Sequence, residues 1–178
     1  MKEFFNTRNL AIIGIICLVA LFRLLEHYFG INMNITPVMA VSLFGGAYFS
    51  NKKAAYLTPM IAMLLSDIVL GFHSTMFAVY GSLLLGVLLG TKMQNRISAL
   101  RVAGSSLASS FLFFIITNFA CWAMYYPTNF AGLVDCYTLA IPFFRTGLIG
   151  DLVWCTVLFG AFELAGKYVP ALAKSETK

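Results

Sequence analysis

The chain has 178 residues, of which 60% are hydrophobic and only 11% are charged. A soluble domain of this length could not bury so much apolar surface, because a large part of any small globule stays exposed to water. The net charge of +5 does not indicate a nucleic acid partner, since Lys and Arg stand in short segments between apolar runs and form no basic patch. The composition therefore predicts an all-α integral membrane protein embedded in a lipid bilayer.

The apolar runs predict a bundle of six transmembrane helices in one domain, residues 1–178. The expected spans are residues 10–28, 36–49, 54–70, 76–90, 102–124 and 144–165. The segment 131–141 is too short to cross a bilayer, so we expect it to lie in the membrane interface and to end at Pro142.

The positive charges predict the orientation of these spans. With six crossings, ten Lys and Arg residues fall on the side of the two termini and two, Arg23 and Arg145, fall on the other. Loops rich in Lys and Arg stay in the cytoplasm, so both termini are expected to be cytoplasmic. Most of the remaining polar residues then collect in the outer half of the protein.

Asp67 stands well inside an apolar run, where a carboxylate is costly unless it is paired or faces a cavity. The only two histidines, His27 and His73, follow apolar helices on the same predicted side. One hypothesis is an outward-facing substrate pocket between the helices. Its candidate lining residues are His27, His73, Asp67, Arg145, Asp151 and loop asparagines such as Asn34. The alternative is structural, with Asp67 and Asp151 paired to Arg23 and Arg145.

The sequence gives little support for metal chemistry or catalysis. It has no HExxH motif, no nucleophile elbow and no Walker A motif, so we expect no enzyme and no intrinsic cofactor. The four cysteines lack CxxC spacing and are interpreted as free thiols. A single histidine can still serve as axial ligand to a metal already held in an organic ring, which keeps His73 and His27 as candidates for that role.

Five stretches resemble a widespread bacterial family of small six-helix inner-membrane proteins, most of them uncharacterised. The stretches are residues 23–27 (RLLEH), 35–49 (ITPVMAVSLFGGAYF), 65–73 (LSDIVLGFH), 117–119 (TNF) and 142–151 (PFFRTGLIGD). The resemblance extends over nearly the whole chain, from about Leu10 to Glu163, and through it Asn118 joins the expected binding residues.

That family is in turn similar to the substrate-binding S components of energy-coupling-factor (ECF) vitamin transporters. The resemblance implies six helices, cytoplasmic termini and a vitamin pocket at the outer face. The resemblance extends to the solitary cobalamin uptake proteins, in which an axial ligand binds cobalt, and it implies that His73 or His27 would take that role here. The first helix lacks the AxxxA motif with which S components often contact a shared energising module, so a solitary transporter fits better than one docked to an ECF module.

These observations together predict a transport protein of the bacterial inner membrane that binds a vitamin-sized substrate, with cobalamin or a related corrinoid as the first candidate. The alternative is a membrane scaffold or assembly factor whose polar outer half binds a protein partner. A transporter predicts that His27, His73 and Asp67 converge on one cavity, whereas a scaffold predicts that they are packed and paired.

Overall fold

The computed structural model describes residues 6–29, 37–169 and 172, and these residues form helices and turns without any strand. The fold class predicted from the sequence, all-α, is confirmed for this part of the chain. The helices are α1 (Thr7–Tyr28), α2 (Val38–Tyr48), α3 (Lys52–Leu70), α4 (Met76–Met93), α5 (Ala99–Tyr125) and α6 (Phe130–Tyr168).

Polar residues immediately before the apolar runs fix where several helices begin. Asn6, Asn51, Ser98 and Asn129 precede α1, α3, α5 and α6, and each side chain accepts a hydrogen bond from a backbone N–H in the first turn. These N–H groups have no partner within their own helix, so the caps favour a helix start at that residue. At the end of α3, Gly71 has a φ of 95°, which other residues rarely adopt, and the chain turns there toward α4.

Five of the described helices, α1 and α3 to α6, are long and apolar enough to cross a membrane, which is the pattern of a multi-pass membrane protein. Helix α2 has only 11 residues, about 16 Å of helix against a hydrocarbon core of about 30 Å. The full-length span predicted at 36–49 is therefore not confirmed by the described residues. They hold the slightly shorter helix 38–48, which is about half as long as the hydrocarbon core is thick and is enclosed by the other helices.

Helix α2 lies at the centre of the bundle. Its residues from Met39 to Tyr48 are all buried, and it packs against each of the other five helices. A Cβ atom added to Gly46 would lie 2.3 Å from the Val87 carbonyl oxygen, and one added to Gly90 would lie 2.3 Å from the Leu43 carbonyl oxygen. Glycine at both positions therefore allows the backbones of α2 and α4 to approach closely, as small residues do in membrane helix pairs.

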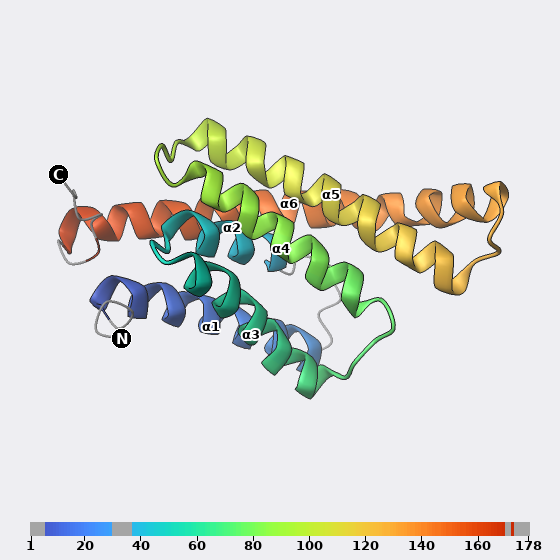
Figure 1. Cartoon of the computed structure of the whole chain (residues 1–178), viewed down its shortest axis with the longest axis horizontal. Coiled ribbons are helices and arrows are strands. Elements are labelled where there is room, and N and C mark those ends of the chain that lie inside the picture. Colours follow the sequence, from blue (N-terminus) through green and yellow to red (C-terminus); the bar gives the residue numbers. More distant parts are fainter. Residues whose placement is uncertain (1–5, 30–36, 170–171, 173–178) are drawn as a thin grey trace.

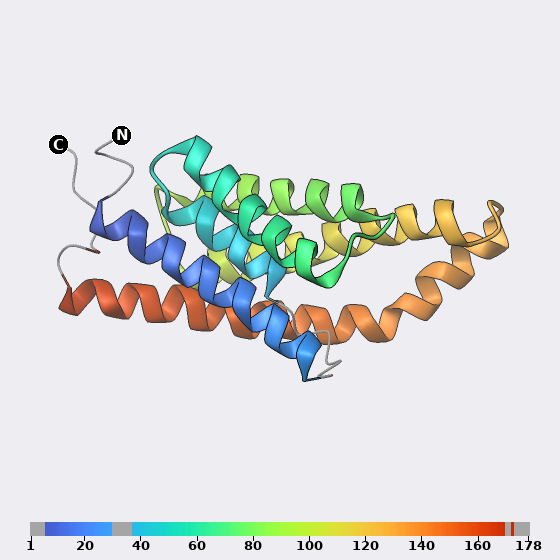
Figure 2. The same cartoon turned by 90° about the horizontal axis from the view of Figure 1, so that it is seen from below.

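The sequence prediction for the last third of the chain is wrong. The expected interfacial segment at 131–141 and the expected span at 144–165 form one helix of 39 residues, α6, with Pro142 inside it. Figure 2 shows that α6 bends along its course. A proline removes one backbone hydrogen bond and kinks a helix whose remaining turns are held by packing. Here α6 packs against α5. The Tyr137 hydroxyl of α6 donates to the Ile115 carbonyl of α5 at 2.8 Å.

The bundle has two distinct ends (Figure 1). We call the end that holds the start of α1 and the end of α6 the terminal end, and the opposite end, with the α3–α4 and α5–α6 turns, the far end. Of the nine described Lys and Arg residues, seven lie toward the terminal end: Arg8, Lys52, Lys53, Lys92, Arg96, Arg101 and Lys167. The charge separation read from the sequence is thus also a separation between the two ends of the folded bundle.

Candidate functional site

A cavity of about 430 Å³ lies in the half of the bundle nearer the far end. All six helices contribute to its wall, from the later turns of α1, α3 and α5, the first turns of α2 and α4, and the part of α6 around Pro142. Its lining residues are Arg23, Val38, Met39, Met63, Val79, Ser110, Phe113, Phe114, Thr117, Asn118, Ala140, Phe143, Phe144, Gly147, Leu148 and Asp151. The wall is mostly apolar and aromatic with a few polar groups, which is the usual composition of a small-molecule site.

Two helical stripes supply most of this wall. On α5 the lining residues run from Ser110 to Asn118, and on α6 they run from Ala140 to Asp151, in both cases at spacings of three and one. Residues so spaced share one face of a helix. The bend at Pro142 falls within the α6 stripe, where Phe143 and Phe144 follow it. The two longest helices therefore face the cavity with regular surfaces, and each contributes two adjacent phenylalanines.

Among the described residues, Asp151 is the one acidic residue that lines this cavity, and only 6% of it is exposed. The Ser110 hydroxyl donates to its Oδ2 at 2.7 Å, and the backbone N–H of Ala40 is close enough to the same carboxyl group to stabilise its charge. Ala40 is in the first turn of α2, where Pro37 provides no side-chain cap. The Asp151 carboxylate thus lies between the positive N-terminal end of the central helix and the cavity, and it interacts with both.

The predicted ion pair between Asp151 and Arg145 is wrong. Arg145 is exposed and does not line the cavity, and among the described residues no cation pairs with Asp151. The two residues are six positions apart on α6, and residues at that spacing point to different faces of a helix. A buried carboxylate with hydrogen bonds but no counter-charge is therefore part of the cavity wall.

The predicted ion pair between Asp67 and Arg23 is confirmed. Arg23 Nη1 lies 2.5 Å from Asp67 Oδ1, and the Tyr80 hydroxyl donates to Asp67 Oδ2 at 2.8 Å. Asp67 is 1% exposed and lies behind Arg23, outside the cavity wall, while the Arg23 side chain is 21% exposed and lines it. The carboxylate that the sequence singles out is thus a support for a cavity residue rather than a cavity residue itself.

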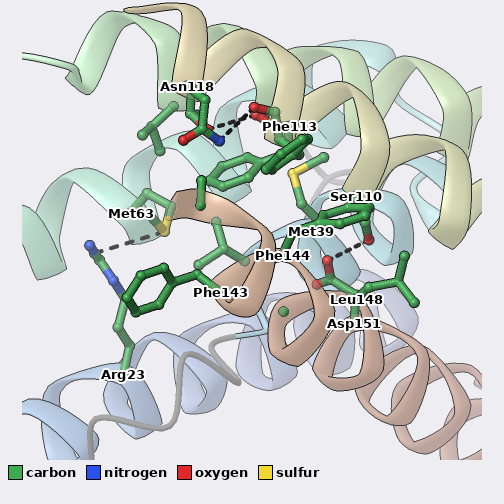
Figure 3. Close-up of a pocket in the computed structure, with 16 residues that line it drawn as sticks. Arg23, Met39, Met63, Ser110, Phe113, Asn118, Phe143, Phe144, Leu148 and Asp151 are labelled. Carbon is green, nitrogen blue, oxygen red and sulfur yellow. Dashed lines mark hydrogen bonds between the residues drawn. The ribbon is translucent and has the colours of Figure 1, made fainter. Parts of the chain in front are cut away.

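Figure 3 shows Arg23 and Asp151 on opposite sides of the cavity, with the labelled phenylalanines between them. The Arg23 guanidinium also contacts the Met63 sulfur at 4.0 Å and donates to the Ser66 hydroxyl. Asn118 lines the cavity on the α5 side, where its amide nitrogen donates to the Phe114 carbonyl of its own helix at 2.8 Å.

Neither histidine lines the cavity. His27 is exposed near the end of α1, and His73 is exposed in the α3–α4 turn, where its Nδ1 lies 3.0 Å from the Thr75 hydroxyl. The expected convergence of His27, His73 and Asp67 on one cavity is therefore wrong. Asn34 lies outside the described residues. Within the described residues no group of three or more His, Cys, Asp or Glu side chains is placed to hold a metal ion.

Sequence reasoning identified Asn118 and Asp151 but missed the aromatic residues of the wall and Ser110. The signal was present in the spacing, since Phe114 and Ser110 stand four and eight positions before Asn118, and Phe144 stands seven before Asp151. These offsets return to the same helix face. Phenylalanine is common in every membrane span, so the pattern does not stand out without the cavity.

A second cavity of about 370 Å³ lies between α5 and α6 nearer the terminal end. Its polar lining includes Ser98, Cys155, Thr156 and Glu163, and Glu163 accepts a hydrogen bond from the Tyr48 hydroxyl at 2.5 Å. It lacks the aromatic wall and the buried carboxylate of the first cavity, which is therefore the better candidate site.

Comparisons with known proteins give a family but no function. No curated protein and no solved structure matches the chain. A family model matches residues 3–172, nearly the whole chain. The protein therefore belongs to the family described as "Family of unknown function (DUF6580)".

Proposed function

We propose that this protein binds a vitamin-sized molecule in the cavity at Asp151 and takes part in its uptake across a bacterial inner membrane. The observation that carries the proposal is the cavity itself, about 430 Å³ with an aromatic wall and two charged residues, Arg23 and Asp151, on opposite sides. Ligand pockets of about 300–1,000 Å³ with an apolar wall and few polar groups enclose drug-sized molecules.

The direction of uptake follows from the charges. The terminal end carries most of the described Lys and Arg residues, so it should face the cytoplasm, and both termini with it. The cavity lies in the other half and would then be loaded from outside. On the resemblance to S components, α2 takes the place of one of six crossings, as a half-length helix at the centre of the bundle.

The size of the cavity favours a vitamin of one or two rings. At about 30 Å³ for each water in the liquid, 430 Å³ corresponds to about 14 waters. A corrinoid is several times larger and would leave most of its body outside. Both histidines lie outside the cavity wall, so cobalt ligation by His73 or His27 would need a binding mode at the far end instead. Cobalamin remains a candidate substrate, but a smaller vitamin fits this cavity better.

The energy source is proposed from the resemblance alone. The chain has no Walker A motif, so energy from ATP would have to come from an ECF energising module or another partner. The absence of an AxxxA motif in α1 favours a solitary transporter.

A scaffold function has one observation in its favour. The hairpin formed by the end of α5 and the start of α6 extends beyond the other helices in both views (Figures 1 and 2), and it exposes Tyr125 and Phe130 by 61% and 80%. Exposed aromatic residues at this position also fit a membrane interface, where tyrosine is enriched. Binding of a protein partner is therefore the second candidate.

The test is to purify the protein in nanodiscs, extract it and identify retained small molecules by mass spectrometry. Ala140→Phe places an aromatic ring in the cavity and should abolish retention, whereas Ala161→Phe, an exposed position on the same helix, should not. Equal retention by the wild type and Ala140→Phe would remove the cavity from consideration. The absence of any bound molecule, together with specific cross-linking of Phe130 to another protein, would favour the scaffold.

A further inference from the structure

The charges around the cavity do not balance. Arg23 and Asp151 are the two charged residues that line it, and Arg23 is already neutralised by Asp67. The other charged side chain on this part of α6, Arg145, is exposed and lies outside the wall. When Asp151 is ionised, the described groups around the cavity therefore carry a net charge of −1.

Hydrogen bonds stabilise the Asp151 carboxylate only in part. Ser110 has a single hydroxyl proton, which it shares between Asp151 Oδ2 at 2.7 Å and the Ser106 carbonyl at 2.9 Å. The Ala40 N–H contributes the partial positive charge of the first turn of α2. An ionised carboxylate can accept about four hydrogen bonds, so acceptor positions remain on the side of the cavity.

The neighbouring wall suits a cation as well. Phe113, Phe114, Phe143 and Phe144 line the same cavity. The faces of aromatic rings attract positive charge, and the attraction is stronger when water is excluded. A carboxylate at one side of an aromatic cavity is a combination that recognises an organic cation rather than a neutral or anionic molecule.

We infer that the ligand of this cavity is an organic monocation, with a positively charged nitrogen against Asp151 and an apolar or aromatic body between the phenylalanines. The inference rests on the proposed function, and it specifies the class of substrate. It also gives Asp151 two roles, since the same carboxyl group anchors the first turn of α2.

The experiment compares three probes of similar size by isothermal titration on the full chain in nanodiscs: benzyltrimethylammonium, its uncharged carbon analogue neopentylbenzene, and the anion phenylacetate. We expect the wild type to bind the cation most tightly. Asp151→Asn keeps the shape and an oxygen acceptor for Ala40, so the fold should persist while affinity for the cation falls about 10- to 100-fold. Affinity for neopentylbenzene should change less than twofold.

The matched control is Asp135→Asn, which removes the same charge from an exposed position on the same helix and should leave all three affinities unchanged. An equal loss in both variants would mean that the effect is general electrostatics and would overturn the inference. Loss of neutral and cationic probes alike in Asp151→Asn would assign Asp151 a purely structural role and also overturn it.

The comparison of probes on the wild type needs no variant. If the neutral probe or the anion binds and the cation does not, the inference fails while the cavity remains a binding site. If no probe of any charge binds, the proposed function fails as well.

Discussion

The two ends of α2 have opposite surroundings. Its last turns pack against α4 through Gly46 and against α6 through Phe44 and Tyr48. The ring centroids of these two residues lie 4.5–5.6 Å from those of Phe159 and Phe162. Its first turn borders the cavity and is held by the carboxyl group of Asp151. One buried helix thus joins a close-packed region, where any added atom must displace backbone, to an open region that depends on polar contacts.

Gly46→Ala should have the largest effect on stability, because it tests the close-packed region directly. The new Cβ would lie 2.3 Å from the Val87 carbonyl oxygen, so α2 and α4 must separate. We expect a loss of about 3 kcal/mol or more in the free energy of unfolding, measured by denaturant titration of the reconstituted protein. Gly160→Ala is the control, since a Cβ there meets nothing within 4 Å. Equal stability of the two variants would show that the helices are not so close.

Asp67→Ala should have the next largest effect, because it leaves Arg23 without its counter-charge. We expect a loss of about 2 kcal/mol, below the usual range for a fully buried pair because the Arg23 side chain is 21% exposed. The double variant Arg23→Met/Asp67→Leu should recover most of this loss, since an apolar pair of similar volume is often as stable as a buried ion pair. The single variants Arg23→Met and Asp67→Leu complete the double-mutant cycle, and additive effects of these two substitutions would argue against the ion pair.

Ser110→Ala should cost about 1 kcal/mol, because the buried Asp151 carboxyl loses a donor and one polar contact between α5 and α6 is lost. Ser82→Ala is the matched control. The Ser82 hydroxyl is also fully buried, but it donates at 2.8 Å to the Ala78 carbonyl of its own helix, so its removal leaves no charged group without a donor. Thermal unfolding of the two variants should differ, and identical midpoints would make Ser110 an ordinary packing residue.

His27→Ala and His73→Ala should have the smallest effects. Both side chains are exposed and lie outside the cavity wall, so the affinity for a ligand held at Asp151 should change less than twofold. Absorbance of the reconstituted variants with added cobalamin gives the sharpest measurement. If either substitution shifts the spectrum of a bound corrinoid, the ligand lies at the far end of the bundle. Axial ligation by a histidine would then replace the proposal that the ligand binds in the cavity.

The sequence predicts much of the fold because the membrane imposes simple rules on it. Apolar length gives the five helices that are long enough to cross a membrane, and the predicted starts at 54 and 102 lie within a few residues of the observed starts of α3 and α5. It does not predict that Pro142 stays inside a helix. The helix α6 packs against α5 there, for example through Tyr137, and such a tertiary contact cannot be read from the local sequence. It also overestimates α2, because a helix enclosed by other helices is as apolar as one that crosses lipid.

The site was less predictable, for a physical reason. Rare residues drew attention to His27, His73 and Asp67, yet the two histidines are exposed and Asp67 is a support for Arg23. Whether a polar residue faces a cavity or a partner depends on helix rotation and on which helices are neighbours. Neither can be read from one sequence. Asp151 was identified as one of several polar residues in the predicted outer half, and Asn118 only through the resemblance, so neither prediction rested on knowledge of its neighbours.

The contact between Asp151 and the first turn of α2 has a consequence for how the protein is assembled in the membrane. Unsatisfied backbone N–H groups at membrane depth cost several kcal/mol each. Helix α2, with the N–H groups of its first turn exposed, is therefore poorly suited to enter the lipid by itself. The carboxyl group that interacts with the Ala40 N–H belongs to α6, the last of the described helices in the chain. We therefore expect α2 to stay shielded during biogenesis until α6 arrives, so that nearly the entire chain must be made before its centre is stable.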